Sequence, residues 1–330
     1  MCAGGVLLLL SSPLAEWNLE TDAYASWQDR SRSAEPRFVQ YFFDALNADE
    51  RAGKVITPGQ LTAADVNLPA LSPTPIERGE TAQQGECLRK LEHWLDSTRA
   101  GVALLRAQRG RGKSTCLGLL VRRLQPRRRV LVCAKSRRAA AALLQAAGEV
   151  EFIAPDRLLQ TLPAADLVIV DEAAMIPQSL LRQLERHYDH LAMATTDGGY
   201  EGTGQGFMLR FVADLRAHGL LQLQLDDPVR WCRGDYLESW LDRVMLQQPR
   251  PEATTSIDVT CCDLQLVQDP GADFALLREV YGLLNQAHYR TRPSDLRMLM
   301  ENPDLALIVA RAGETIVGAV LLNREGGFDE

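Results

Sequence analysis

The first segment whose residue types suggest chemistry is a glycine-rich run that contains a lysine and a serine. Residues 107–114 read AQRGRGKS; they follow an apolar run at 102–105, and an amphipathic helical pattern starts at Lys113. This is the sequence context of a phosphate-binding loop at a helix N-terminus. We therefore predict that Lys113 contacts the β- and γ-phosphates of a nucleotide and that Ser114 binds magnesium. The backbone N–H groups expected around the β-phosphate belong to Gly110, Arg111 and Gly112.

One position departs from the usual phosphate-loop pattern. Ala107 stands where the first glycine is common. Glycine is favoured where the backbone turns sharply, so this departure weakens the pattern, although alanine is the smallest available substitute.

Two adjacent carboxylates supply the partner that such a loop needs. Asp171 and Glu172 end an apolar run, LVIV at 167–170, which is typical of a buried strand. We predict that Asp171 holds magnesium through water and that Glu172 orients or deprotonates the attacking water. The alternative, that both residues merely cap a helix, does not explain why they end a buried strand.

A glutamine and an arginine are weaker candidates for nucleotide contacts. Gln84 lies ahead of the first predicted strand of this region, where its amide can pair with the edge of an adenine; an exposed glutamine is the alternative. Arg230 follows a predicted strand, where an arginine can stabilise charge on a transferring phosphoryl group; a surface arginine is the alternative.

Composition narrows the class of protein. The chain has 330 residues, of which 46% are hydrophobic and 24% charged, so it is expected to fold as more than one domain. Its longest apolar run, residues 4–10, is much shorter than the roughly 20 residues that cross a bilayer. The seven cysteines include no CxxC pair. We expect a cytosolic protein with reduced thiols, no membrane span and no zinc site.

Basic residues are concentrated in one part of an acidic chain. The formal net charge is −7, yet residues 97–148 contain thirteen Lys or Arg and no Asp or Glu. A polyanion such as a nucleotide or RNA suits this segment. A solvated helix end and turn is the alternative explanation for the arginines at 122–129.

The middle of the chain alternates short apolar runs with longer helical patterns, which predicts a parallel sheet with crossover helices. We predict an α/β fold in which this P-loop, RecA-like domain spans residues 76–250. Proline-rich breaks at 68–75 and 247–252 delimit it. The predicted strands are 102–105, 130–134, 167–170, 191–194 and 221–225, and the predicted helices are 113–124, 137–147, 178–186 and 236–246.

The segments on either side of this domain are expected to belong to other domains. Residues 1–75 are expected to form the last part of a small α/β domain, with a helix at 37–46. Residues 251–330 predict a strand at 259–267, helices at 273–286 and 294–300, and a hairpin of 306–310 with 315–322.

Five short segments, taken together and in order, carry a resemblance to a known family. They are 109–114 (RGRGKS), 171–177 (DEAAMIP), 199–204 (GYEGTG), 228–231 (PVRW) and 287–296 (AHYRTRPSDL). With them the chain resembles the bacterial tRNA(Met) cytidine acetyltransferases and, more distantly, the eukaryotic RNA cytidine acetyltransferases.

The resemblance implies an activity and a domain order. That family acetylates the wobble cytidine of elongator tRNA(Met) to N4-acetylcytidine, using acetyl-CoA and ATP. Its helicase-like ATPase domain is followed by an acetyltransferase domain of the GNAT fold, which residues 251–330 would begin. We expect the acetyl-CoA loop to lie beyond this chain, which would then be inactive in acetyl transfer. The alternative function is an RNA-dependent ATPase or helicase without acetyl transfer.

The resemblance also implies roles for particular residues. It makes Gln84 the nucleotide-reading glutamine and Arg230 an ATP-contacting arginine. It extends the ATP loop on both sides of the glycines, and the residues added are Arg109, Thr115, Cys116, Leu117 and Gly118.

Overall fold

The structure is a computed structural model that describes residues 37–48, 80–125, 127–196, 211–216, 219–231, 233–246, 262–286 and 293–324. These residues divide into two compact units, one within 80–233 and one made of 37–48 with 234–324. The apolar run at 4–10, which we interpret as a buried strand, both proline-rich breaks and the GYEGTG segment lie outside the described residues.

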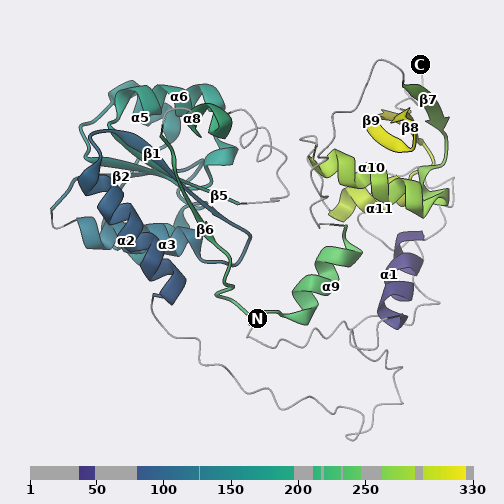
Figure 1. Ribbon diagram of the computed structural model, residues 1–330, viewed down its shortest axis with the longest axis horizontal. Helices are drawn as coiled ribbons and strands as arrows, with labels where there is room; N and C mark the ends of the chain where they lie inside the picture. Colours follow the sequence, from purple (N-terminus) through teal and green to yellow (C-terminus); the bar gives the residue numbers. More distant parts are fainter. Residues whose placement is uncertain are drawn as a thin grey trace, which may run out of the picture. The chain divides into compact units, whose positions relative to one another are not determined.

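The first unit is built on a six-stranded parallel sheet in the order β3-β2-β4-β5-β1-β6 (Figure 1). Because β5 pairs with both β1 and β4, it separates the strand before the glycine-rich loop from the strand before the carboxylates. The strands are β1 (Gly101–Ala107), β2 (Val130–Cys133), β3 (Glu151–Phe152), β4 (Leu167–Val170), β5 (His190–Thr196) and β6 (Leu221–Leu225).

Helices cover both faces of this sheet. In Figure 1, α5, α6 and α8 lie over one face, and α2 and α3 lie over the other. A short 3₁₀ helix, Ala173–Met175, follows β4. The helices are α2 (Ala82–Ser97), α3 (Lys113–Leu124), α4 (Ala141–Ala147), α5 (Pro155–Thr161), α6 (Gln178–His187) and α8 (Ala213–Arg216).

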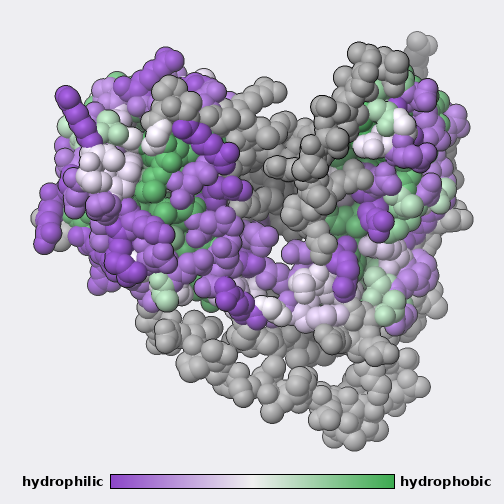
Figure 2. All heavy atoms as spheres, in the orientation of Figure 1, coloured by the Kyte–Doolittle hydropathy of each residue, from purple (hydrophilic) through white to green (hydrophobic). Residues whose placement is uncertain are grey.

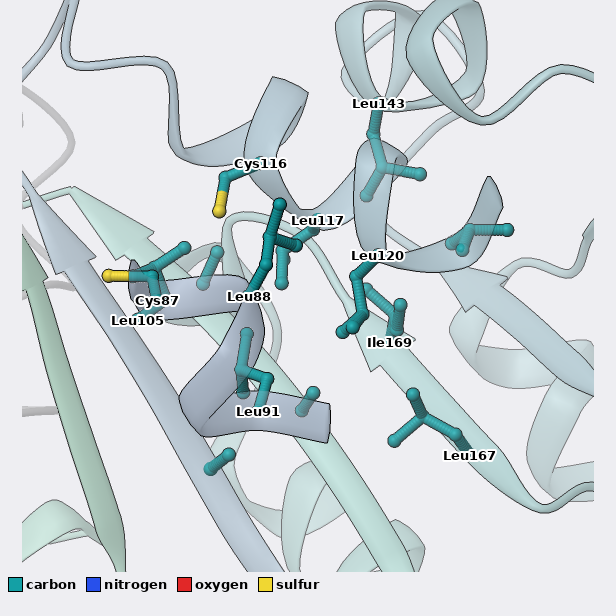
Figure 3. Close-up of a cluster of buried hydrophobic side chains, with 14 of the residues drawn as sticks. Cys87, Leu88, Leu91, Leu105, Cys116, Leu117, Leu120, Leu143, Leu167 and Ile169 are labelled. Atoms are coloured by element: carbon teal, nitrogen blue, oxygen red, sulfur yellow. The ribbon is translucent and has the colours of Figure 1, made fainter. Parts of the chain in front are cut away.

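The central strands are apolar throughout because both of their faces are buried. In β4, Leu167 and Ile169 join one hydrophobic cluster while Val168 and Val170 join the other. The first cluster is filled by leucines of α2 and α3 together with Leu143 of α4 (Figure 3). A four-residue strand buried on both faces thus holds the following residues, Asp171 and Glu172, at a defined place.

The second unit contains an antiparallel sheet in the order β7-β8-β9. Its core includes side chains of α10, α11, β8 and β9. The elements are α9 (Tyr236–Val244), β7 (Asp263–Val267), a 3₁₀ helix (Pro270–Ala272), α10 (Phe274–Gln286), α11 (Pro293–Glu301), β8 (Leu305–Ala312) and β9 (Thr315–Asn323).

Helix α1 (Arg37–Asn47) packs in this second unit although more than two hundred residues separate it from its partners in sequence. The buried Glu301 carboxylate accepts the Phe38 backbone N–H at 3.1 Å. The Tyr41 hydroxyl donates to the Val244 carbonyl of α9 at 2.8 Å. The chain therefore leaves the second unit after α1, forms the first unit, and returns at α9.

The predicted helices and strands of the described residues are largely confirmed. Helix 113–124 and strands 167–170 and 221–225 have the predicted bounds, and the hairpin is extended by a few residues. Residues 137–140 form a turn rather than the start of a helix. The sequence analysis did not predict α2, the two-residue β3, α5 or the four-residue α8. The predicted domain boundary at 250 remains a prediction, although the contacts of α9 lie with the second unit.

The coloured part of the surface seen in Figure 2 is mostly hydrophilic. Among the described helices, none has the length and apolar content that a bilayer crossing requires.

We expect Gly118→Ala to destabilise the first unit, because α3 and α4 approach each other closely there. An added Cβ would lie 2.7 Å from the Ala146 Cβ and would also meet the Leu143 carbonyl. Overpacking of this kind costs about 1–3 kcal/mol. Chemical denaturation monitored by circular dichroism measures the loss. Gly318→Ala is the control, since its Cβ has 3.5 Å to the Ala310 side chain; equal effects of the two changes would contradict the packing argument.

Candidate functional site

The carboxyl ends of β1, β4 and β5 form one edge of the parallel sheet, and the polar residues that follow these strands meet there. The loop after β1 leads into α3 and supplies Lys113 and Ser114. Asp171 and Glu172 follow β4, and Thr196 ends β5. The order of strands therefore brings two separate predicted motifs to one place.

The glycine-rich loop needs glycine at two positions. Gly110 and Gly112 have φ angles of 78° and 76°, in the left-handed region that side chains disfavour. A Cβ on Gly110 would also lie 2.8 Å from an atom of the Trp231 ring, and one on Gly112 would lie 2.6 Å from the Gln84 amide nitrogen. Ala107 is the last residue of β1 in ordinary strand backbone, so this position does not need glycine.

Two hydrogen bonds connect the loop to the carboxylates. The Lys113 ammonium donates to Glu172 Oε1 at 2.5 Å. The Ser114 hydroxyl donates to Asp171 Oδ1 at 3.2 Å. The structure thus brings together the lysine, serine and two carboxylates that the sequence analysis singled out.

Glu172 is held in place by more than its lysine. The Thr196 hydroxyl lies 3.0 Å from each carboxylate oxygen of Glu172 and donates to that carboxylate. The Glu172 backbone is left-handed, with φ 49° and ψ 51°. Left-handed backbone at a residue other than glycine is strained, and such strain is concentrated at functional sites.

Asp171 has the surroundings of a cation ligand. Its side chain is fully buried; Oδ1 accepts from the Ser114 hydroxyl and the Glu172 N–H, while Oδ2 has no hydrogen-bond donor among the described residues. Burial raises the pKa of this carboxyl to about 6, against the opposing effect of the Ser114 hydrogen bond. An unpartnered buried carboxylate oxygen beside a serine hydroxyl fits Mg²⁺, which takes few protein ligands and completes its shell with phosphate and water. In the described part of the chain, no three His, Cys, Asp or Glu residues group as a metal site.

A pocket of about 120 Å³ opens over the loop. Pockets that enclose a whole small ligand measure roughly 300–1,000 Å³, so this one suits the phosphates of a nucleotide and leaves the remainder outside. Arg230 lies at its border and is exposed. The lining residues are Gln108, Gly110, Arg111, Gly112, Lys113, Ser114, Thr115, Ala142, Val229 and Arg230.

Gln84 lies beside the loop, but its amide is already engaged. Its oxygen accepts from the Thr81 N–H at 3.0 Å, completing a capping box at the start of α2, and its nitrogen donates to the Gly112 carbonyl at 3.0 Å. The side chain is buried and does not line the described pocket. In this structure Gln84 supports the loop; reading of an adenine by Gln84 stays a prediction.

The outer residues of the predicted ATP loop are spread over different environments. Cys116 and Leu117 are buried in the core, and burial raises the pKa of the Cys116 thiol to about 12, which leaves it uncharged. Gly118 packs against α4, and the Arg109 side chain is exposed. Of the residues that the resemblance added, Thr115 lines the pocket. Cys116, Leu117 and Gly118 therefore face the core. They belong to α3, whose first turn borders the pocket, but they do not line the pocket themselves.

Sequence reasoning missed Thr196 and the contacts of the segment after β6. A polar residue that ends an apolar run was the available signal for Thr196, but only the strand order shows which strand lies between β1 and β4. Val229 N–H donates to the Gly110 carbonyl at 2.8 Å, and the Arg111 guanidinium lies 5.7 Å from the centre of the Trp231 ring. These contacts join residues that no local pattern connects.

Comparison with known protein families gives a match that covers most of the first unit and extends into α9. Residues 104–150 and 144–248 match the family described as RNA cytidine acetyltransferase NAT10/TcmA, helicase domain. Among solved structures, Bacteroides Pif1 bound to ssDNA aligns with a TM-score of 0.34 and 12% identity, covering 57% of this chain and 59% of that chain. That likeness is too weak to inform function.

Curated relatives match nearly the whole chain. The tRNA(Met) cytidine acetyltransferase TmcA of Nitrosococcus halophilus is 35% identical over 99% of this chain and 49% of its own length. The protein of the same name from Citrobacter koseri is 36% identical over 98% of this chain and 47% of its own length. The chain spans about half the length of these relatives. By sequence, it belongs to the family of the tRNA(Met) cytidine acetyltransferases and contains that family's helicase domain.

Proposed function

We propose that this chain is the ATP-binding and ATP-hydrolysing part of an enzyme that acetylates a tRNA cytidine. The observation that carries the proposal is the meeting of the glycine-rich loop with two carboxylates, in which Lys113 contacts Glu172 and Ser114 contacts Asp171. Both motifs lie at one edge of a parallel sheet, next to a pocket of the size of a phosphate chain. The name of the family supplies the rest of the proposal, namely the tRNA substrate and acetyl transfer.

Each residue of the site would have its own role in ATP hydrolysis. Phosphate oxygens would take the place of the Glu172 carboxylate on Lys113, since both are anions within reach of one ammonium group. Glu172, still held by the Thr196 hydroxyl, would then orient the attacking water and accept its proton. Asp171 and Ser114 would hold Mg²⁺, which supplies charge neutralisation on the phosphates. Arg230, at the border of the pocket, would stabilise charge on the transferring phosphoryl group.

ATP would serve to reshape RNA rather than to activate the acetyl group. An acetyl thioester is already activated, whereas a wobble base stacked in the anticodon loop must be extracted before it can react. Extraction costs a few kcal/mol. The first unit offers a single nucleotide-binding α/β sheet, which suits a local rearrangement of RNA better than continuous strand separation.

The whole protein's activity is proposed from the family. We infer that it forms N4-acetylcytidine at the wobble position of elongator tRNA(Met) from acetyl-CoA in the cytoplasm. Residues 251–330 would begin the GNAT acetyltransferase domain, which would follow an ATPase domain at 76–250 and part of a small domain at 1–75.

Deletion of the gene tests the proposed product. We expect N4-acetylcytidine to disappear from elongator tRNA(Met) in the deletion strain and to return when the complete gene is restored. Mass spectrometry of nucleosides from that tRNA measures the change. An unaltered level of N4-acetylcytidine would contradict the acetylation proposal and leave the RNA-dependent ATPase as the alternative.

Lys113→Ala tests the nucleotide loop. We expect ATP hydrolysis to fall by at least about 100-fold, because the cation that meets the phosphates is lost. Lys90→Ala is a matched control: Lys90 also pairs with a glutamate, Glu86 at 2.6 Å, but lies exposed on α2. Turnover of Mg-ATP and thermal unfolding are measured for both variants. Normal turnover by the folded Lys113→Ala variant would refute the assignment of the loop.

Thr196→Val tests the support of Glu172. Valine keeps the shape but removes the hydroxyl that donates to the carboxylate, so we expect turnover to fall about tenfold while ATP still binds. Thr196→Ser retains the hydroxyl and should keep most of the activity. Steady-state hydrolysis of Mg-ATP distinguishes the two variants, and equal rates for valine and serine would argue against this role.

A further inference from the structure

The segment 226–231, which we call the arginine arm because it carries Arg230, is fastened to the first turn of α2 by one side chain. The Gln83 amide oxygen accepts the backbone N–H groups of Asp226 at 3.0 Å and of Asp227 at 2.9 Å. The arm begins directly after β6, which lies at the edge of the sheet. The Gln83 oxygen therefore pairs two N–H groups just beyond the point where strand pairing ends.

The other end of the arginine arm contacts the glycine-rich loop. Val229 donates its backbone N–H to the Gly110 carbonyl at 2.8 Å. The Trp231 ring lies against Gly110, filling the space that a Cβ on this glycine would occupy. Arg230 stands between these two contacts, at the border of the pocket.

Little freedom remains between the two points of attachment. Pro228 lies between Asp227 and Val229, and its ring fixes φ near −65°. The segment between 227 and 229 therefore has one fewer free backbone torsion with which to absorb a displacement at 226–227. Gln83 does not line the pocket, but it contacts the backbone three and four residues before Arg230.

We propose that Gln83 is a positioning residue for ATP hydrolysis, which holds the arginine arm so that Arg230 faces the phosphates. This proposal rests on the proposed ATPase function and deepens it. Two neighbouring glutamines in the first turn of α2 then have different partners. Gln84 donates to the Gly112 carbonyl of the glycine-rich loop, and Gln83 accepts from the backbone of the arginine arm. Both sides of the pocket are set by one helical turn.

A structural link between α2 and residues 226–227 without any bearing on Arg230 is the competing explanation, and a double-mutant cycle separates the two. We expect Gln83→Ala to lower kcat/KM for Mg-ATP about tenfold, and to change whichever of kcat and KM the variant Arg230→Ala changes. Alanine is the best helix former, so α2 itself should persist. Combined with Arg230→Ala, the Gln83→Ala change should cause no further loss, because there is no arginine left to position.

Two further variants control the interpretation. Gln83→Glu keeps an acceptor oxygen and suits the first turn of a helix, so it should retain most of the activity. Gln183→Ala removes an exposed glutamine whose nitrogen donates to the Ser179 carbonyl within α6, and should leave turnover unchanged. Thermal unfolding is recorded for every variant, and the affinity for Mg-ATP replaces turnover as the readout where hydrolysis is too slow to measure.

The outcomes distinguish this proposal from the proposed function beneath it. Normal kinetics of Gln83→Ala beside impaired Arg230→Ala would overturn the positioning role alone. A Gln83→Ala loss that multiplies fully with the Arg230→Ala loss would do the same. Normal turnover in both Lys113→Ala and Arg230→Ala would overturn the ATPase proposal and the positioning role with it.

Discussion

The contact between the Lys113 ammonium and the Glu172 carboxylate is the interaction around which the first unit is arranged. It joins the helix after β1 to the end of β4, and it forms only because β5 alone lies between these two strands. In the structure, the two charges form an ion pair. An arriving phosphate chain would compete with Glu172 for Lys113 and release the carboxylate toward the attacking water. Thr196, at the end of the intervening strand, donates to the same carboxylate, so Glu172 has a second partner besides Lys113.

Burial on both faces of the sheet fixes the positions of the polar residues that follow its central strands. The central strands carry apolar side chains in both directions, and two hydrophobic clusters hold them from opposite sides. A parallel sheet of this kind presents its polar residues where the strands end. Asp171 shows the consequence: it is fully buried at the end of a short apolar strand, with one carboxylate oxygen still available for a cation. The left-handed backbone of Glu172 is strained, and the packing around it offsets the free-energy cost of that strain.

The chain passes from the first unit to α9 of the second unit within a few residues of Trp231. The arginine arm ends at Trp231, and Asp235 already caps α9 of the second unit by accepting the Glu238 N–H at 3.0 Å. Helix α9 in turn contacts α1, from which the chain departs toward α2, through Tyr41 and through an edge-to-face contact of Phe42 with Trp240. The turn of α2 that contacts the arm is the first helical turn of the first unit in the described part of the chain. The start of α2 and the arginine arm, which lie near the two ends of the first unit in sequence, therefore both contact the glycine-rich loop.

The sequence by itself determined the phosphate loop, the two carboxylates and most of the strands and helices, because each depends on local residue spacing: glycines before a lysine at a helix start, and apolar runs that end in charge. The resemblance carried by five segments identified the family as well. The sequence analysis did not predict α2 or the short elements β3, α5 and α8. Only the tertiary structure decided that Thr196 holds Glu172, that Gln84 supports the loop with both ends of its amide, and that Gln83 fastens the arm of Arg230. Those contacts depend on which strands are neighbours and on which helix turn meets which loop, and the packing of distant segments sets both.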